Sequence, residues 1–186
     1  VVLDPARGPE VWSGGDLTAM TPMLTETGSI AVVQGGRLGG TSALNGLATL
    51  RGLAEDDDAW AAAGLEGWAW RDVVSTFIAA ERDLDFGASP IHGDRGPLPV
   101  RRWRRDEHSR AQVAWLDGMG EIGVPFVSDI NDPTQLPGYG VFPATIDDDA
   151  RRVTTSLAYL TPTVRERENL RIRTNAEVAR VVVEDG

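Results

Sequence analysis

The chain has 186 residues, of which 41% are hydrophobic, and its formal net charge is −10. This length and apolar content are sufficient to bury a core, so we expect a globular rather than a disordered protein. All eighteen basic residues are arginine, and acidic residues outnumber them. The negative charge argues against nucleic acid or an anionic membrane surface as a partner.

The sequence contains no cysteine, which excludes disulfides, thiolate metal sites and a cysteine nucleophile. No apolar run is long enough to cross a membrane, and no signal-peptide pattern is visible, so we expect a cytoplasmic protein with no membrane partner. The chain opens on Val1-Val2-Leu3 and closes on a valine-rich run that enters Asp185-Gly186. Both ends read as interior strands, and we expect an excerpt from a longer protein.

The first elements surround a glycine-rich stretch. Residues 1–3 predict a short strand closed by Asp4, residues 5–30 a long loop, and residues 30–33 a second strand. "GGRLGGTSALNG" follows, and Thr41 or Ser42 could cap a helix that ends at Gly52. Glycines before a helix N-terminus let backbone N–H groups approach an anion such as a diphosphate, although a tight turn explains them equally well. Asp4 is either a ribose ligand at a strand end or a turn former.

Apolar spacing predicts further elements downstream. Trp70, Val73, Val74, Phe77 and Ile78 mark one face of a helix over residues 70–83. We expect an extended edge segment at "GPLPVRRW", a helix over residues 109–122, a short helix capped by Thr154 or Thr155 and stopped near Pro162, and strands at 170–174 and around Val178 to Val182. "GMGEIG" matches GxGxxG by letter, but we interpret it as a helix end with Gly123 just past it.

Other polar clusters are assigned no chemistry. Acidic runs at 55–58 and 147–149, and "DINDPT", lack the spacing of an EF-hand loop, so we expect solvated surface and no metal. The arginines around Trp103, at 101–105, are interpreted as an exposed edge with local ion pairs rather than a phosphate grip. His92, in an expected turn, and His108 have no nucleophile nearby in sequence, so no residue is assigned as catalytic.

Several stretches, in consistent order, resemble one family. "GGRLGGTSALNGLATLRG" is similar to the first signature of the glucose-methanol-choline (GMC) flavoprotein oxidoreductases, with an Arg, an apolar residue, Gly-Gly and two small residues before Asn-Gly and Arg-Gly. "DDDAWAAAGLEGWAWRDVVSTFIAAE", "IHGDRGPLPV" and "DDARRVTTSLAYLTPTVRERENLRIRTNAEVARVVVEDG" resemble later segments of the same family. The resemblance covers almost the whole chain.

The resemblance implies an α/β fold: a partial FAD/NAD(P)-binding Rossmann-like domain with part of an α+β substrate-side subdomain. We expect residues 1–87 in the FAD-binding domain, 88–145 in the substrate-side subdomain, and 146–186 back in the FAD-binding domain. It also implies a noncovalent FAD. The implied cofactor-binding residues are Asp4 at the ribose, Arg37, Gly39, Gly40 and Thr41 near the diphosphate, Asn45, Gly46 and Ala48 toward the flavin, and Val178 beside the adenine.

The activity that the resemblance implies is oxidation of an alcohol by hydride transfer to the flavin. The family's catalytic histidine region would lie beyond Gly186, so we expect no catalytic residue here and an inactive excerpt. A small-molecule alcohol is the expected partner of the whole protein, while the oligomeric state is left open. Two alternatives remain: a hydroxynitrile-lyase-type FAD protein and a noncatalytic truncated paralogue.

Overall fold

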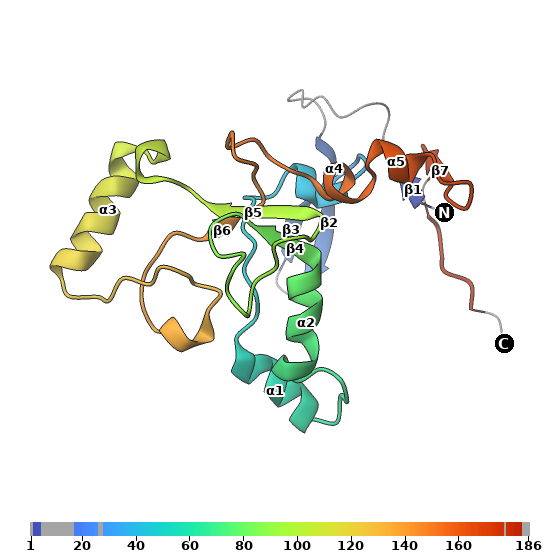
Figure 1. Ribbon diagram of the computed structural model, residues 1–186. Helices are drawn as coiled ribbons and strands as arrows, with labels where there is room; N and C mark the ends of the chain where they lie inside the picture. Colours follow the sequence, from blue (N-terminus) through green and yellow to red (C-terminus); the bar gives the residue numbers. More distant parts are fainter. Residues whose placement is uncertain (1, 5–16, 26–27, 177, 184–186) are drawn as a thin grey trace. The chain divides into compact units, whose positions relative to one another are not determined.

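The computed structural model in Figure 1 describes residues 2–4, 17–25, 28–176 and 178–183. The chain divides into two compact units, one formed by Val1–Gly46 with Thr154–Gly186 and the other by Leu47–Val153. The domain boundaries expected near residues 88 and 145 stay predictions. Within the described residues no helix has the length and apolarity needed to cross a bilayer, and the expected cytoplasmic location stays a prediction.

The first unit contains two pairs of strands. β1 (Val2–Asp4) pairs in parallel with β7 (Ile172–Thr174), which confirms both expected strands. β2 (Leu17–Thr25) and β3 (Gly28–Gly35) form an antiparallel pair. The loop expected over residues 5–30 is therefore wrong where β2 lies, because pairing with β3 supplies backbone partners that local composition does not reveal. Residues 5–16 lie outside the described residues.

The glycine stretch forms a shorter helix than expected. η1 (Gly40–Ala43) is a single 3-10 turn, and Leu47 has a φ of 69°. Beyond it Ala48 forms a β-bridge with Ala144. The helix expected from 41 to 52 is wrong, because the backbone after the turn finds hydrogen-bond partners in a distant segment instead of in a helix.

The end of the first unit is only partly as expected. The Thr154 hydroxyl accepts a hydrogen bond from the Leu157 N–H at 3.2 Å and caps α4 (Thr155–Tyr159), as predicted. Pro162 also begins a second short helix, α5 (Pro162–Arg165). The strand expected around Val178 to Val182 does not form in the described residues 178–183, because within the described chain no neighbouring strand pairs with it.

The second unit is built on a small mixed sheet with strand order β4-β5-β6. β4 (Glu81–Asp83) runs parallel to β5 (Leu98–Arg102), and β6 (Pro143–Ala144) runs antiparallel to it. The unit also contains α1 (Ala54–Ala62), α2 (Trp70–Ala80), α3 (Arg110–Glu121) and the 3-10 turns η2 (Arg105–Glu107) and η3 (Pro133–Gln135). In Figure 1, α2 leads directly into β4, whereas α3 lies apart from α1 and α2.

Both long predicted helices form, but the first was expected to reach residue 83, whereas α2 ends at Ala80 and residues 81–83 form β4. In α2 the predicted apolar stripe is half-buried, and most of the remaining positions are exposed. In α3 the Ser109 hydroxyl caps the Gln112 N–H and the Gln112 side chain returns to the Ser109 N–H. Gly123 follows the helix with a φ of 81°. "GMGEIG" is therefore a helix end, as predicted.

The arginine-rich strand is the main departure in this unit. β5 lies in the centre of its sheet, and Arg101 and Arg102 are 1% and 8% exposed, so the expected exposed edge is wrong. Pro99 is tolerated because β6 pairs only with Arg101 and Arg102, leaving Pro99 in the half of the strand that pairs with β4 alone. The expected ion pairs of Arg101 and Arg102 form inside the protein, whereas Arg104 and Arg105 are exposed as expected and Arg105 pairs with Asp117 at the surface.

Candidate functional site

The glycine turn, residues 35–46, combines two left-handed glycines with a 3-10 turn. Gly39 has a φ of 91° and Gly40 a φ of 53°, a region that side chains with a Cβ rarely adopt. The Gly40 N–H donates to the Arg37 carbonyl at 2.8 Å, and the Thr41 carbonyl accepts from the Asn45 N–H at 2.9 Å. The long helix dipole expected next to this turn is absent, since η1 has only four residues.

Glycines of this turn serve two different purposes. A Cβ at Gly35 would lie 2.1 Å from the Gly40 carbonyl oxygen, and one at Gly39 would lie 3.1 Å from the Ser156 hydroxyl. These two positions are explained by the chain's own packing. At Gly40 and Gly46 an added Cβ would meet nothing within 4 Å. Of these four glycines, Gly40 and Gly46 leave bare backbone beside open space, which is the cradle that a diphosphate or flavin would need.

Hydroxyl groups join the glycine turn to the start of α4. The Ser42 hydroxyl accepts from the Thr155 N–H at 3.0 Å and lies 3.1 Å from the Thr155 hydroxyl, which donates to the Gly39 carbonyl at 3.2 Å. Because these residues are more than a hundred positions apart in sequence, local reasoning missed this link. The turn is consequently held at Gly39 and Ser42 by its own unit.

The implied cofactor residues divide into three groups. The glycine turn brings together Arg37, Gly39, Gly40, Thr41, Asn45 and Gly46, of which the last two and Thr41 are exposed. Ala48, also exposed, belongs to the second unit. The backbone of Asp4 ends a parallel strand, and Val178 is 56% exposed. The roles of all nine residues stay predictions.

A buried ionic cluster lies in the second unit, and sequence reasoning missed it. We call it the His92 cluster; each of its six side chains is at most 8% exposed, and its members are Arg51, Glu81, Asp83, His92, Arg102 and Asp129. The solvated surface expected for "DINDPT" is wrong at Asp129, because distant arginine and histidine side chains pair with it.

His92 lies at the centre of this cluster. Its Nδ1 is 2.7 Å from a Glu81 carboxylate oxygen and 3.2 Å from an Asp83 oxygen. Its Nε2 is 2.6 Å from an Asp129 oxygen. Both ring nitrogens therefore donate to carboxylates, which requires the doubly protonated imidazolium.

Two arginines complete the pairing. Arg51 donates to Glu81 at 2.6 Å and stacks over Phe77, with 5.5 Å between the guanidinium carbon and the ring centroid. Arg102 donates to Asp83 and, at 2.7 Å, to Asp129. With a protonated imidazole, three cations face three carboxylates and the cluster is electrically neutral.

The electrostatics follow from this geometry. Burial by itself disfavours the charged imidazolium, but hydrogen bonds to Asp129, Asp83 and Glu81 outweigh it and raise the pKa of His92 to about 10. Burial likewise opposes ionisation of Asp83, yet hydrogen bonds from His92 and Arg102 hold the pKa of this carboxyl well below its usual range. His92 and Asp83 are therefore both charged at neutral pH.

Glu81, Asp83 and His92 also resemble a metal site, with ligand atoms within 4.8 Å of one another. A metal ion would have to displace arginine cations from both carboxylates and a proton from the imidazole. The arrangement suits ion pairing better than metal binding. The sequence carried one signal of this cluster, the spacing of Glu81 and Asp83, which places both on one strand face. The structure adds that Gly93 is required next to His92, because a Cβ there would lie 1.9 Å from the Ile78 carbonyl oxygen.

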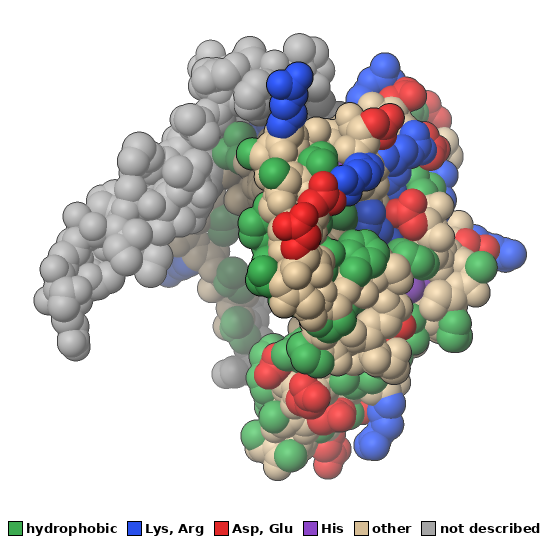
Figure 2. Space-filling view, turned by 90° about the vertical axis from the view of Figure 1, so that its left-hand side faces the viewer, with side chains coloured by type: hydrophobic (Ala, Val, Ile, Leu, Met, Phe, Trp, Pro, Cys, Tyr) green, Lys and Arg blue, Asp and Glu red, His purple; other side chains and the backbone are tan. Residues whose placement is uncertain are grey.

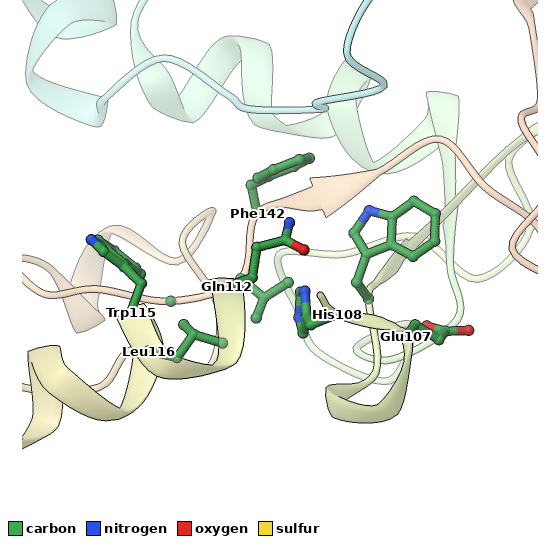
Figure 3. Close-up of a pocket in the computed structure, with 9 residues that line it drawn as sticks. Glu107, His108, Gln112, Trp115, Leu116 and Phe142 are labelled. Carbon is green, nitrogen blue, oxygen red and sulfur yellow. The ribbon is translucent and has the colours of Figure 1, made fainter. Parts of the chain in front are cut away.

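An apolar cavity of about 380 Å³ adjoins α3 in the same unit. Figure 3 shows Phe142 above the Gln112 amide, with Trp115 and Leu116 to one side and the Glu107 carboxylate pointing away.

On the face viewed in Figure 2, acidic and basic side chains are intermingled with exposed apolar ones and form no broad basic patch. Such a surface gives no support to binding of a phosphate backbone.

Comparison with known proteins identifies the family. The model of the GMC oxidoreductase family matches residues 11–186. The chain is 36% identical over 152 residues to a 5-(hydroxymethyl)furfural oxidase from Methylovorus sp. (strain MP688), covering 80% of this chain and 28% of that protein. The chain belongs to the GMC oxidoreductase family.

Solved structures agree with this assignment. The crystal structure of pyridoxine 4-oxidase from Mesorbium loti superposes with a TM-score of 0.74 at 34% identity, covering 82% of this chain and 30% of that one. An FAD-dependent oxidoreductase from Chaetomium thermophilum gives a TM-score of 0.60 at 25% identity, covering 74% and 25%. The expected partial Rossmann-like α/β fold is confirmed. The chain spans less than a third of the length of each of these relatives.

Proposed function

We propose that this chain forms part of the FAD site of an alcohol-oxidising flavoprotein. The observation that carries the proposal is the open backbone at Gly40 and Gly46, beside exposed Thr41 and Asn45, within a family match over residues 11–186. The φ of Gly40 already favours glycine, but Gly46 has neither a positive φ nor a neighbour within 4 Å in the chain's own packing, so a ligand at the backbone gives this glycine a reason. The FAD is proposed to bind noncovalently.

The proposed reaction removes a hydride from the alcohol carbon and a proton from its hydroxyl group. When bound, FAD supplies the acceptor for the hydride. We assign the hydroxyl proton to no residue of this chain. His92 is unsuited to be the base, because its side chain is buried and both nitrogens already bond to carboxylates. Relatives named 5-(hydroxymethyl)furfural oxidase and pyridoxine 4-oxidase support a primary alcohol as the substrate class.

FAD binding is tested with a matched pair of substitutions. Gly46→Ala and Gly118→Ala each add a methyl group where nothing lies within 4 Å, and neither glycine has a positive φ. In protein made from the full coding sequence, we expect Gly46→Ala to weaken FAD binding about tenfold or more, measured by quenching of flavin fluorescence, and Gly118→Ala to leave it unchanged. Equal FAD affinities for both variants and the unaltered protein would contradict the proposed site.

The reaction class requires a second experiment. An alcohol substrate added without oxygen should bleach the flavin absorbance, because the hydride enters the flavin. A bound flavin that no alcohol bleaches while a hydroxynitrile is cleaved would favour a lyase on the same scaffold. A correctly folded product that binds no flavin would favour a noncatalytic paralogue.

A further inference from the structure

The segment just after the glycine turn, residues 47–51, alternates between two environments. Ala48 and Leu50 are exposed, whereas Thr49 and Arg51 are half-buried. The segment is extended and lies against residues 143–145: the Thr49 N–H donates to the Pro143 carbonyl at 2.9 Å, and the Thr145 N–H donates to the Leu47 carbonyl at 3.0 Å. This pairing fixes one edge of the segment's backbone.

Asn131 holds the other edge. Its side-chain oxygen accepts from the Arg51 N–H at 3.0 Å, and its side-chain nitrogen donates to the Thr49 carbonyl at 3.0 Å. Asn131 is 5% exposed and substitutes for a neighbouring strand by bonding two backbone groups at once. The backbone N–H of Asn131 in turn donates to Asp129 at 3.1 Å.

The Arg51 side chain adds a third attachment, since it enters the His92 cluster. It donates to Glu81 at 2.6 Å and to the Ile91 carbonyl at 2.8 Å. The same cluster holds Asp129, and therefore Asn131, through His92 and Arg102. Side chain and backbone of the segment thus lead to one buried ionic centre.

We infer that Arg51 and Asn131 are positioning residues for the cofactor site: they tie residues 47–51, which continue directly from Gly46, to the His92 cluster and so fix the conformation of that segment. The inference rests on the proposed function and on the expectation, from the family resemblance, that Ala48 lies toward the flavin. This role explains why six charged groups are buried here, because ion pairs fix the positions of their side chains more strictly than apolar packing does.

The test compares three variants in protein made from the full coding sequence. Arg51→Ala and Asn131→Ala remove the attachments, whereas Val100→Ala removes a fully buried apolar side chain and serves as the control for stability loss alone. At a temperature where all are folded, we expect the first two to weaken FAD binding about tenfold and to shift the flavin absorption band. Val100→Ala should retain the wild-type dissociation constant and spectrum, and Arg51→Lys should recover part of the Arg51→Ala defect.

Wild-type affinity and spectrum in both Arg51→Ala and Asn131→Ala would overturn the inference while leaving the proposed function intact. Amide hydrogen exchange measured without FAD further separates failure of this inference from failure of the proposed function. Residues 47–51 should exchange at least about tenfold faster in these variants than in Val100→Ala. Unchanged exchange in residues 47–51 overturns the inference, whether or not the wild-type protein binds FAD. Absence of FAD binding in the wild-type protein would by itself refute the proposed function.

Discussion

The glycine turn and the His92 cluster differ in what surrounds their polar groups: the turn leaves backbone open, whereas the cluster buries charged side chains against one another. In the turn, Gly40 and Gly46 leave backbone beside open space, and several neighbouring side chains are exposed. In the cluster, every charged group faces an oppositely charged group of the same chain. The contrast teaches that charged side chains paired with one another within the chain serve the fold, whereas open backbone points to a ligand only where, unlike at Gly118, it lies within a family motif.

The largest effect is expected from His92→Gln, which removes the central cation and leaves carboxylates unbalanced. Breaking a buried ion pair costs about 3–5 kcal/mol, to be measured by urea unfolding. His108→Gln is the matched control, since the only other histidine is half-buried and outside the cluster. A loss below about 1 kcal/mol in His92→Gln would mean that the ion pairs of the His92 cluster do not stabilise the fold as described above.

Stability should depend on pH through the same residue. The folded pKa of His92, about 10, lies above its unfolded value of 6.5, so its contribution is fully present below pH 6.5 and is lost as the pH rises through about 10. The decline is at most about 1.4 kcal/mol per pH unit. Unfolding midpoints measured from pH 6 to 10 should fall in the wild type and stay flatter in His92→Gln; parallel curves would refute the assignment.

Alanine at individual glycines sharpens the comparison between the regions. Gly93→Ala and Gly35→Ala place a Cβ 1.9 and 2.1 Å from backbone oxygens and should destabilise by about 1–3 kcal/mol or more. Gly46→Ala meets nothing and should change stability by less than about 0.5 kcal/mol. Thermal unfolding of the three variants checks this, and similar losses in all three would remove the distinction between packing glycines and open ones.

The last prediction concerns neither region and calibrates the others. Ser109→Ala removes the cap of α3 and should cost about 1 kcal/mol. Equilibrium unfolding measures this loss, and because Ser109 is exposed and far along the chain from the glycine turn, FAD affinity should be unchanged. Altered FAD affinity would show that stability loss alone disturbs the cofactor site, and it would weaken the comparison with Gly46→Ala.

Sequence reasoning succeeded where the signal is local and failed where it depends on distant partners. The helix at Trp70, the cap at Ser109 and the glycine after α3 were predicted because periodicity and caps act within a few residues. The burial of Arg102 was not, because its partners Asp83 and Asp129 come from elsewhere in the chain. The strand at 17–25 was missed although its partner β3 follows it directly, because the composition of residues 5–30 is typical of a loop. The proposed roles of Asp4 and Val178 stay predictions.

By itself, the sequence determined the family, through ordered motifs from the glycine turn to the segment after Thr154, and it determined which helices form. Only the tertiary structure decided which glycines are open and which are filled, and that His92 belongs to an ionic centre rather than a solvated turn. The physical reason is that burial and ion pairing depend on which segments meet in space. Arg51, Glu81 and Asp129 are far apart in sequence, and only folding brings their charges within hydrogen-bond distance of one imidazole or of each other.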